Sequence, residues 1–391
     1  MSSNLRGKCA IVGVGQSRLG QLRGCSAAGL LVEAIAGAIE DAGLEKSAID
    51  GLITRGPDDV YCHHQRIGQA LGLDVRFSTT LDNGGASQCL AVGVACMAID
   101  AGLCSTVVCG YGRDSWSRTR SGDAKARVAL IPESQQAREF GPEFGFFGAT
   151  AMHALAARRH MHEFGTTREH WGAIATTFRE HASRNPAAQM REPISMQQYL
   201  AARWIVEPFG LFDCSLVTDG AGAVIVTSAD RARNLRKPPV YVLSAATANN
   251  LRGWFDADHM TRTAAVRSGK AAYEMAGVRP SDIDTAQIYD CFTHMVVVQL
   301  EDYGFCEKGE GGPFAASGAL RLGGSLPCNT SGGQLSEGHV EGMLQIVEAV
   351  RQVRHEHTPD RQVPDARLAL VSGHGGNTVC HSTLILGREP G

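Results

Sequence analysis

Cys89 is the first residue whose type and position could do chemistry. It follows a glycine-rich stretch, "LDNGGAS", and opens an apolar run, "CLAVGVACMAIDAG", that predicts a helix. A thiol at a helix N-terminus can act as a nucleophile, because free backbone N–H groups and the helix dipole stabilise its thiolate. The alternative is a small apolar residue packed on the inner face of the helix, since free cysteines are often buried.

Three other candidates stand in short motifs. Tyr289 lies in "IYDCF", His339 in "SEGHVEG" and His374 in "SGHGGNTVCH". A phenol can donate a hydrogen bond or exchange a proton, and an imidazole can do both near neutral pH. These residues are candidates for acid–base catalysis and for holding a substrate oxygen. His381 alternates with apolar residues and is interpreted as a structural residue of a strand.

An internal repeat predicts how these motifs are positioned. "AIEDAGLEKSAIDGLI" and "AAYEMAGVRPSDIDTAQI" match at a constant offset, which aligns Gly43 with Gly277 and Ile49 with Ile283. In both copies a periodic helix ends at glycine, a favourable C-cap, and a short turn leads into an apolar strand. We therefore expect two copies of one α/β domain, with Ile49 and Ile283 starting equivalent strands.

Strand-like runs alternate with helical ones, which favours sheets covered by helices. The first copy is expected to span residues 1–235 and the second 236–391. Residues 115–205, approximately, are polar and then amphipathic, and predict an insertion in the first copy. The strand-like runs are 8–14, 105–111, 222–227, 239–244, 367–372 and 382–386.

Composition excludes several classes of protein. The net charge is −3 and no basic stripe is present, which argues against nucleic acid as a partner. The apolar runs are too short to span a membrane. The 12 cysteines are scattered, and the N-terminus has no signal-peptide pattern, so a reduced, cytoplasmic protein is expected. Without a C-x-x-C pair, no metal site is predicted.

Several of these motifs occur together in one family. "HEFGTT", "HASRNPAAQ", "IYDCFT", "NTSGGQLSEGH" and "GHGGNTVCHSTLIL" resemble, in this order, stretches of the thiolase superfamily, in the branch of sterol-carrier-protein thiolases and lipid-transfer-type aldolases. The resemblance covers nearly the whole chain. It implies a thiolase fold: two duplicated α/β halves in five αβαβα layers, an inserted loop domain for coenzyme A, and a homodimer.

The resemblance also bears on Cys89. Thiolases attack their substrate with a cysteine at the N-terminus of a buried helix, and the family register places Gly85 at that position. The usual nucleophile is then missing, and space is expected where its side chain would lie. A shifted register would restore Cys89 as the nucleophile.

The resemblance gives roles to the other candidates. Tyr289 takes the place of a residue that holds a thioester oxygen or a water, and lipid-transfer-type aldolases are similar in carrying tyrosine there. His339 matches the histidine that stabilises the enolate, although Val340 replaces the family's proline. His374 stands in the loop of the family's last catalytic cysteine and could substitute as acid–base. Gly85, Gly375 and Gly376 are candidates for backbone oxyanion contacts.

Three functions remain open. The first is a carbon–carbon lyase of the retro-aldolase type that acts on an acyl-CoA without a cysteine nucleophile. The second is an acyltransferase that uses Cys89. The third is a non-catalytic acyl-CoA- or lipid-binding subunit. In each the coenzyme A thioester is the ligand and no tightly bound cofactor is expected, and an OB-fold/zinc-ribbon protein is a possible partner. Basic residues of the insertion could pair with coenzyme A phosphates or lie on exposed helix faces. They are Arg158, Arg159, Arg179, His181 and Arg184.

Overall fold

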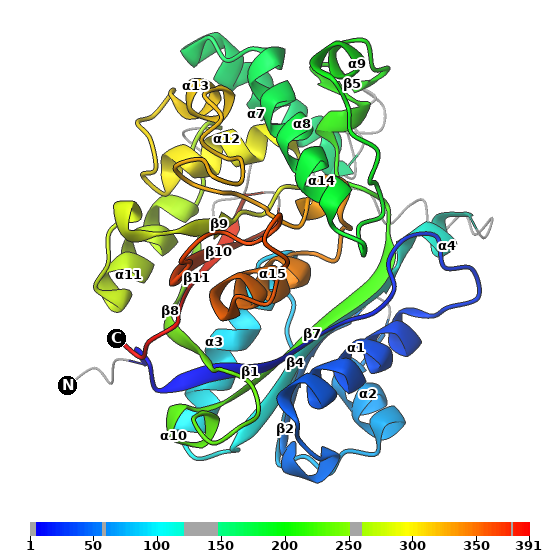
Figure 1. Cartoon of the computed structure of the whole chain (residues 1–391). Coiled ribbons are helices and arrows are strands. Elements are labelled where there is room, and N and C mark those ends of the chain that lie inside the picture. Colours follow the sequence, from blue (N-terminus) through cyan, green and yellow to red (C-terminus); the bar gives the residue numbers. More distant parts are fainter. Residues whose placement is uncertain (1–4, 57–59, 121–147, 251–259, 377) are drawn as a thin grey trace.

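A nine-stranded mixed sheet runs through the molecule, seen here in a computed structural model that describes residues 5–56, 60–120, 148–250, 260–376 and 378–391 (Figure 1). All six predicted strand-like runs are strands of this sheet. In spatial order the strands are β3 (Phe77–Thr80), β2 (Gly51–Arg55), β4 (Thr106–Asp114), β7 (Asp219–Ser228), β1 (Cys9–Gln16), β8 (Val240–Asn249), β11 (Cys380–Gly387), β10 (Leu368–Gly375) and β9 (Thr285–Gln287).

The strand order is symmetric about the contact between β1 and β8. In the first half β2 is parallel to β4, which is antiparallel to β7; in the second half β9 is parallel to β10, which is antiparallel to β11. Cys328 forms an isolated parallel bridge with Ala286 of β9, in the place that β3 takes beside β2. The sheet therefore consists of two duplicated halves, as the repeat predicts.

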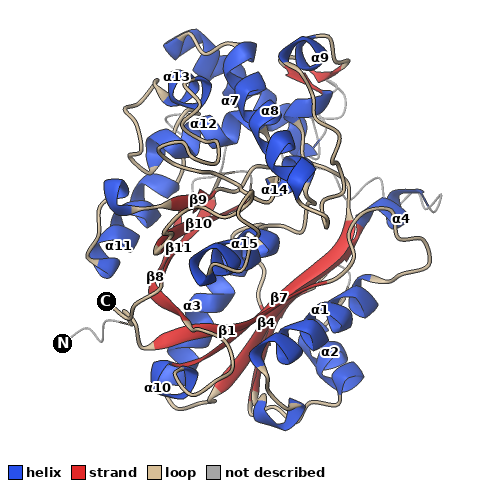
Figure 2. Ribbon diagram, viewed as in Figure 1, coloured by secondary structure: helices blue, strands red, loops and turns tan. Residues whose placement is uncertain are grey.

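The helices complete five layers. Figure 2 shows α3 (Ser87–Asp100) and α15 (Met343–Arg354) in the middle of the molecule, and both contact strands from the two halves. On the outer faces, α1 (Ala27–Ala42) and α2 (His63–Leu71) cover the first half, and α11 (Ala265–Ala276) covers the second. The order is thus αβαβα, the thiolase arrangement that the resemblance implies.

A close approach of α1 to β1 shows why glycine is needed in this layer packing. An ideal Cβ placed on Gly15 would lie 1.9 Å from the carbonyl oxygen of Ala34, in α1. The helix can lie directly on the strand only because Gly15 has no side chain.

Most of the remaining helices, among them α7, α8, α9, α12 and α13, lie above the second half (Figure 2), whereas α4 and α10 lie against strands of the first half. The two amphipathic stretches of the predicted insertion form α7 and α8, whereas residues 121–147 of that insertion lie outside the described residues. The proposed domain boundary after residue 235 stays a prediction. The elements not yet given are α4 (Ser115–Arg120), α7 (Gly148–Phe164), α8 (Arg168–Arg184), α9 (Met196–Leu200), β5 (Trp204–Val206), β6 (Phe209–Gly210), α10 (Ala229–Ala232), α12 (Thr293–Asp302), α13 (Gly311–Ala316) and α14 (Gly333–Ser336).

The turns that follow the repeated helices are equivalent in the two halves. α1 ends at Gly43 and α11 at Gly277, and both glycines have a φ of 65°. A single 3₁₀ turn follows each, and Ile49 and Ile283 end those turns just before β2 and β9. The predicted equivalence of these two isoleucines is therefore confirmed.

One carboxylate in each half ties the start of its own strand to the neighbouring strand. Asp50 accepts hydrogen bonds from the backbone N–H of Ser105 and of Thr106, both at 2.8 Å. Asp284 accepts from Arg367 at 2.8 Å and from Leu368 at 2.9 Å. The same carboxylate clamp thus sets the register of β2 with β4 and of β9 with β10.

Replacing either aspartate by asparagine should destabilise the protein. In each clamp both backbone N–H groups donate to one oxygen of the carboxylate. A neutral amide oxygen is a weaker acceptor than a charged one, so we expect Asp50→Asn and Asp284→Asn each to lower the free energy of unfolding by about 1–2 kcal/mol. Urea unfolding monitored by circular dichroism measures this, with Asp74→Asn, at an exposed position, as the matched control. Losses no larger than that of the control would contradict the assigned role.

Candidate active site

Tyr289 and His339 lie together between the two halves of the fold. Tyr289 is the second residue after β9, and His339 lies in the loop between α14 and α15. The hydroxyl oxygen of Tyr289 is 3.5 Å from Nε2 of His339, and the two rings meet edge to face. Nδ1 of His339 is 3.1 Å from the hydroxyl of Ser215. The structure therefore brings together the two residues that the sequence proposed as a pair.

Tyr289 also fills the place of the missing side chain at residue 85. An ideal Cβ on Gly85 would lie 2.2 Å from the Tyr289 hydroxyl oxygen and 2.3 Å from its ring carbons. The expectation of space at this position is therefore wrong: the phenol occupies it. Any larger residue at position 85 would displace Tyr289 from the N-terminal end of α3.

His374 lies on the other side of Tyr289. The two rings are stacked, with centroids 5.4 Å apart and an interplanar angle of 13°. His374 is buried near the end of β10, where it pairs across the strands with His381 of β11. The prediction that His374 approaches the same site agrees with this geometry, although its role stays a prediction.

The glycines around His374 let its strand lie against the loop before α3. An ideal Cβ on Gly375 would lie 1.8 Å from the carbonyl oxygen of Asn83. Gly376, with a φ of 56°, continues the turn towards β11. Gly85, Gly375 and Gly376 thus lie near Tyr289 and His374, and their oxyanion contacts stay a prediction.

Cys89 is separate from this group of polar side chains. It lies in the first turn of α3, is 1% exposed, and its Sγ is 3.9 Å from the carbonyl oxygen of Val371. Burial raises the pKa of the thiol, and a thiol that stays protonated is a poor nucleophile. The packed-thiol interpretation of Cys89 is the one that this environment favours.

A buried polar network holds the backbone of Tyr289. The hydroxyl of Ser372 accepts from the Tyr289 N–H at 2.8 Å, and the Gln299 side chain donates to the Tyr289 carbonyl at 2.8 Å. Ser372 in turn donates to Gln299 at 2.6 Å. Asn329, from the "NTSGG" motif, bonds both backbone groups of Ile288, at 2.6 and 2.8 Å. The backbone groups of both Ile288 and Tyr289 are therefore held in place by buried hydrogen bonds.

Two arginines approach the His339 loop from the first half. Arg55, the last residue of β2, forms an ion pair with Glu341. Arg113, near the end of β4, lies 3.7 Å from the same carboxylate and donates a hydrogen bond to the His339 carbonyl at 3.3 Å. Sequence reasoning missed all three residues. The available signal was that Arg55 and Arg113 come at the carboxyl ends of parallel strands, where ligands are commonly bound.

The side chains of Tyr289, His339 and His374 are electrically neutral. Burial raises the pKa of Tyr289 well above its usual value, so its phenol is protonated. Burial, and then the charge of Arg113, lower the pKa of His339, and burial lowers the pKa of His374 to about 3. A substrate proton can therefore move among these three side chains even though none of them is ionised before the reaction begins.

The basic residues of the insertion do not converge on Tyr289. Arg179 donates to the hydroxyl of Ser336 at 2.9 Å, and His181 lies 3.2 Å from the carbonyl oxygen of Asn329, so both are buried structural residues. The other three arginines pair with carboxylates at the surface. These are Arg158 with Glu207, Arg159 with Glu163 and Arg184 with Glu180.

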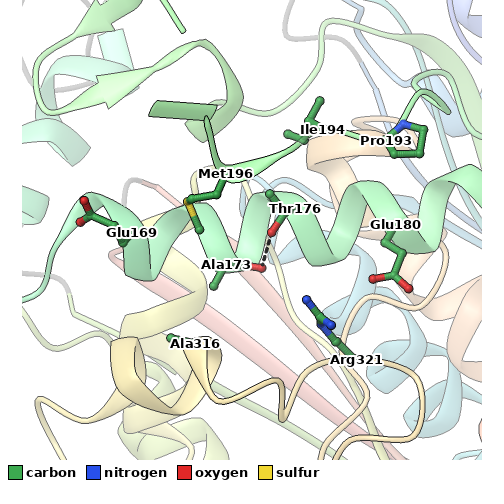
Figure 3. A pocket seen from close by; sticks show the side chains of 9 residues that line it. All are labelled: Glu169, Ala173, Thr176, Glu180, Pro193, Ile194, Met196, Ala316 and Arg321. Carbon is green, nitrogen blue, oxygen red and sulfur yellow. Dashed lines mark hydrogen bonds between the residues drawn. The ribbon is translucent and has the colours of Figure 1, made fainter. Parts of the chain in front are cut away.

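A cavity of about 510 Å³ lies elsewhere, against α8 (Figure 3). Glu169, Thr176 and Glu180 line it from α8, and Arg321 faces them from the opposite side. None of the predicted site residues lines this cavity, so we do not assign it to the chemistry. Its other lining residues are Ala173, Pro193, Ile194, Met196 and Ala316.

Alkylation should distinguish the two interpretations of Cys89. Because its thiol is buried and protonated, iodoacetamide should label half-buried cysteines such as Cys25 and Cys62 first, as measured by mass spectrometry of peptides over time. Cys89→Ala should lower the free energy of unfolding by only about 1 kcal/mol, the loss of a small packed group. Labelling of Cys89 before all other cysteines would contradict this interpretation.

Comparisons with known proteins agree with the fold. Residues 246–388 match the family described as Thiolase C-terminal domain-like. The chain is 37% identical to the steroid side-chain-cleaving aldolase of Thermomonospora curvata, over 99% of this chain and 100% of that protein. It is 36% identical to the 17-hydroxy-3-oxo-4-pregnene-20-carboxyl-CoA lyase of Mycobacterium tuberculosis, over 98% and 100%.

A solved structure extends the comparison. The structure described as Ltp2-ChsH2(DUF35) aldolase superposes with a TM-score of 0.88 at 37% identity, covering 98% of this chain and 99% of that one. Among the described residues, no helix is both long and apolar enough to cross a membrane. With relatives of this identity matched along their full length, the chain belongs to the thiolase superfamily, in the branch of the sterol-carrier-protein thiolases and lipid-transfer-type aldolases.

Proposed function

We propose that this protein is a lyase that cleaves a carbon–carbon bond of a β-hydroxyacyl-CoA by a retro-aldol reaction. The observation that carries the proposal is the position of Tyr289, whose phenol fills the place of a nucleophile side chain at Gly85 and faces His339. A site without a nucleophile, but with a phenol–imidazole pair, suits proton transfer better than acyl transfer. The names of the two relatives, an aldolase and a CoA lyase, support the same reaction.

Tyr289 removes the hydroxyl proton with the help of His339. A protonated phenol can accept a proton only if it passes its own proton on, and Nε2 of neutral His339, 3.5 Å away, is the acceptor. His339 is free to accept there when its Nδ1–H donates to Ser215, 3.1 Å away. The β-hydroxyl then becomes a carbonyl as the bond between the α and β carbons breaks.

The electron pair of the broken bond passes into the thioester and forms its enolate. His339, now an imidazolium, stabilises the enolate oxygen, as does any backbone N–H that Gly85, Gly375 or Gly376 supplies. The proton then returns from His339, through Tyr289, to the α carbon. The products are a ketone or aldehyde and a shortened acyl-CoA, and the proton balance closes without water.

The names of the relatives support a proposal for the substrate class and the partners. The lyase relative is named for a steroid acyl-CoA with a 17-hydroxyl group, and we propose a bulky acyl-CoA of this type as the substrate here. We further propose a cytoplasmic homodimer that works with an OB-fold/zinc-ribbon protein. The similar structure, whose name joins Ltp2 to ChsH2(DUF35), supports such a partner.

Removing one hydroxyl group tests the proposal. Tyr289→Phe should lower kcat by about 10²–10⁴-fold, the usual contribution of a general acid–base group, and change KM little. The assay follows release of the ketone from 17-hydroxy-3-oxo-4-pregnene-20-carboxyl-CoA, with and without a DUF35 protein. Tyr273→Phe is the matched control, because it removes a half-buried hydroxyl of α11 that donates to the Tyr303 carbonyl at 3.1 Å and that the proposed reaction does not use.

Three results would overturn the proposal. Turnover by Tyr289→Phe at the rate of the control would show that the phenol does not transfer the proton. An acyl adduct on Cys89, found by mass spectrometry together with loss of activity in Cys89→Ala, would establish the acyltransferase instead. Binding of the acyl-CoA with neither turnover nor an adduct would leave the non-catalytic subunit as the function.

A further inference from the structure

A group of buried ligand-type side chains lies behind Tyr289 and is not used in the reaction above. Its members come from separate elements of the fold: His153 from α7, Cys291 from the segment between β9 and α12, and His374 from β10. All three are at most 9% exposed. Two more buried histidines adjoin them, His294 of α12 and His381 of β11.

The three side chains converge on one point. One nitrogen from each histidine and the Cys291 sulfur all lie within 4.8 Å of one another. The rings of His153 and His374 have centroids 5.4 Å apart. Ligands around a tetrahedral zinc ion lie about 3.5 Å from each other, which follows from zinc–nitrogen and zinc–sulfur bonds of about 2.0–2.3 Å. The ligand atoms lie within 4.8 Å of one another, so metal binding requires the three side chains to move closer together.

The ring nitrogens of this group lack hydrogen-bond partners. Among the described residues, neither nitrogen of His374, His294 or His381 has one, nor does Nδ1 of His153. Buried polar groups nearly always have a partner, since leaving them unpaired costs free energy. Hydrogen bonding elsewhere therefore does not account for this cluster, whereas a ligand held among these nitrogens would.

We infer that His153, Cys291 and His374 bind a divalent transition metal ion of the zinc type. Imidazole nitrogen and thiolate sulfur are the ligands that zinc prefers, and three protein ligands leave a fourth position for a water or a substrate oxygen. On binding, the S–H bond of Cys291 breaks, its proton passes to solvent and a metal–sulfur bond forms. The histidines bind as neutral imidazoles, the form that burial favours for both His153 and His374.

Metal content can be measured without any substrate, so this inference stands or falls independently of the retro-aldol proposal. The full chain, untagged and purified from zinc-supplemented cells, should contain about one zinc per chain by elemental analysis. Less than about a tenth of that, both as purified and after dialysis against zinc, would overturn the inference.

Cobalt substitution then identifies the ligands. The cobalt form should show visible ligand-field bands and a near-ultraviolet thiolate-to-cobalt band. Cys291→Ser should lose the thiolate band, and His374→Gln should weaken binding at least about tenfold. Cys109→Ser, at a buried thiol of β4 in a different part of the core, should change neither the bands nor the affinity.

A variant is informative only if its circular dichroism spectrum matches that of the wild-type protein. If Cys291→Ser does not fold, His374→Gln and the metal content of the wild-type chain still decide the question. A thiolate band that survives in folded Cys291→Ser, or cobalt affinity unchanged in folded His374→Gln, would show that the metal binds elsewhere and would overturn the assignment.

Discussion

The contact between the Tyr289 ring and the Cα of Gly85 is the constraint on which the rest of the site depends. There is no room at this contact for a Cβ, which would overlap the phenol. Gly342, with a φ of 86°, makes a second close approach: a Cβ there would lie 3.3 Å from both the Gly85 carbonyl oxygen and the Tyr289 ring. The phenol is thus enclosed by glycine backbone on two sides, and this packing directs its hydroxyl towards His339.

The backbone around Tyr289 is fixed by hydrogen bonds and not by charge. Ser372, Gln299 and Asn329 bond the main chain at Ile288 and Tyr289, and all are fully buried. Asp290, the next residue, accepts from the backbone N–H of Gln334 and Leu335, which ties the Tyr289 segment to the start of α14. Burial raises the pKa of Asp290 to about 7 in spite of these bonds. The amide and hydroxyl groups of Ser372, Gln299 and Asn329 are uncharged and well partnered, so burying them costs little free energy and the segment is held rigidly.

Duplication explains where each part of the site comes from. The first half supplies the N-terminal end of α3 with Gly85, and the second half supplies Tyr289, His339 and His374. Because α3 and α15 pack between the two halves, loops that are equivalent in the repeat meet from opposite sides. One half therefore contributes backbone to the site, and the other half contributes the acid–base side chains.

The sequence by itself determined the architecture. Apolar periodicity and glycine C-caps at Gly43 and Gly277 are local signals, and with the repeat they predicted all strands of the sheet except β3, the helices of the insertion and the duplication, whereas the five layers were implied by the family resemblance. The tertiary structure decided what occupies the space at Gly85, where the sequence analysis expected an opening. It also brought together His153, Cys291 and His374, and placed Arg55, Arg113 and Glu341 at the His339 loop. These contacts join residues far apart in the chain, and a short pattern holds no information about them because they depend on how the elements pack.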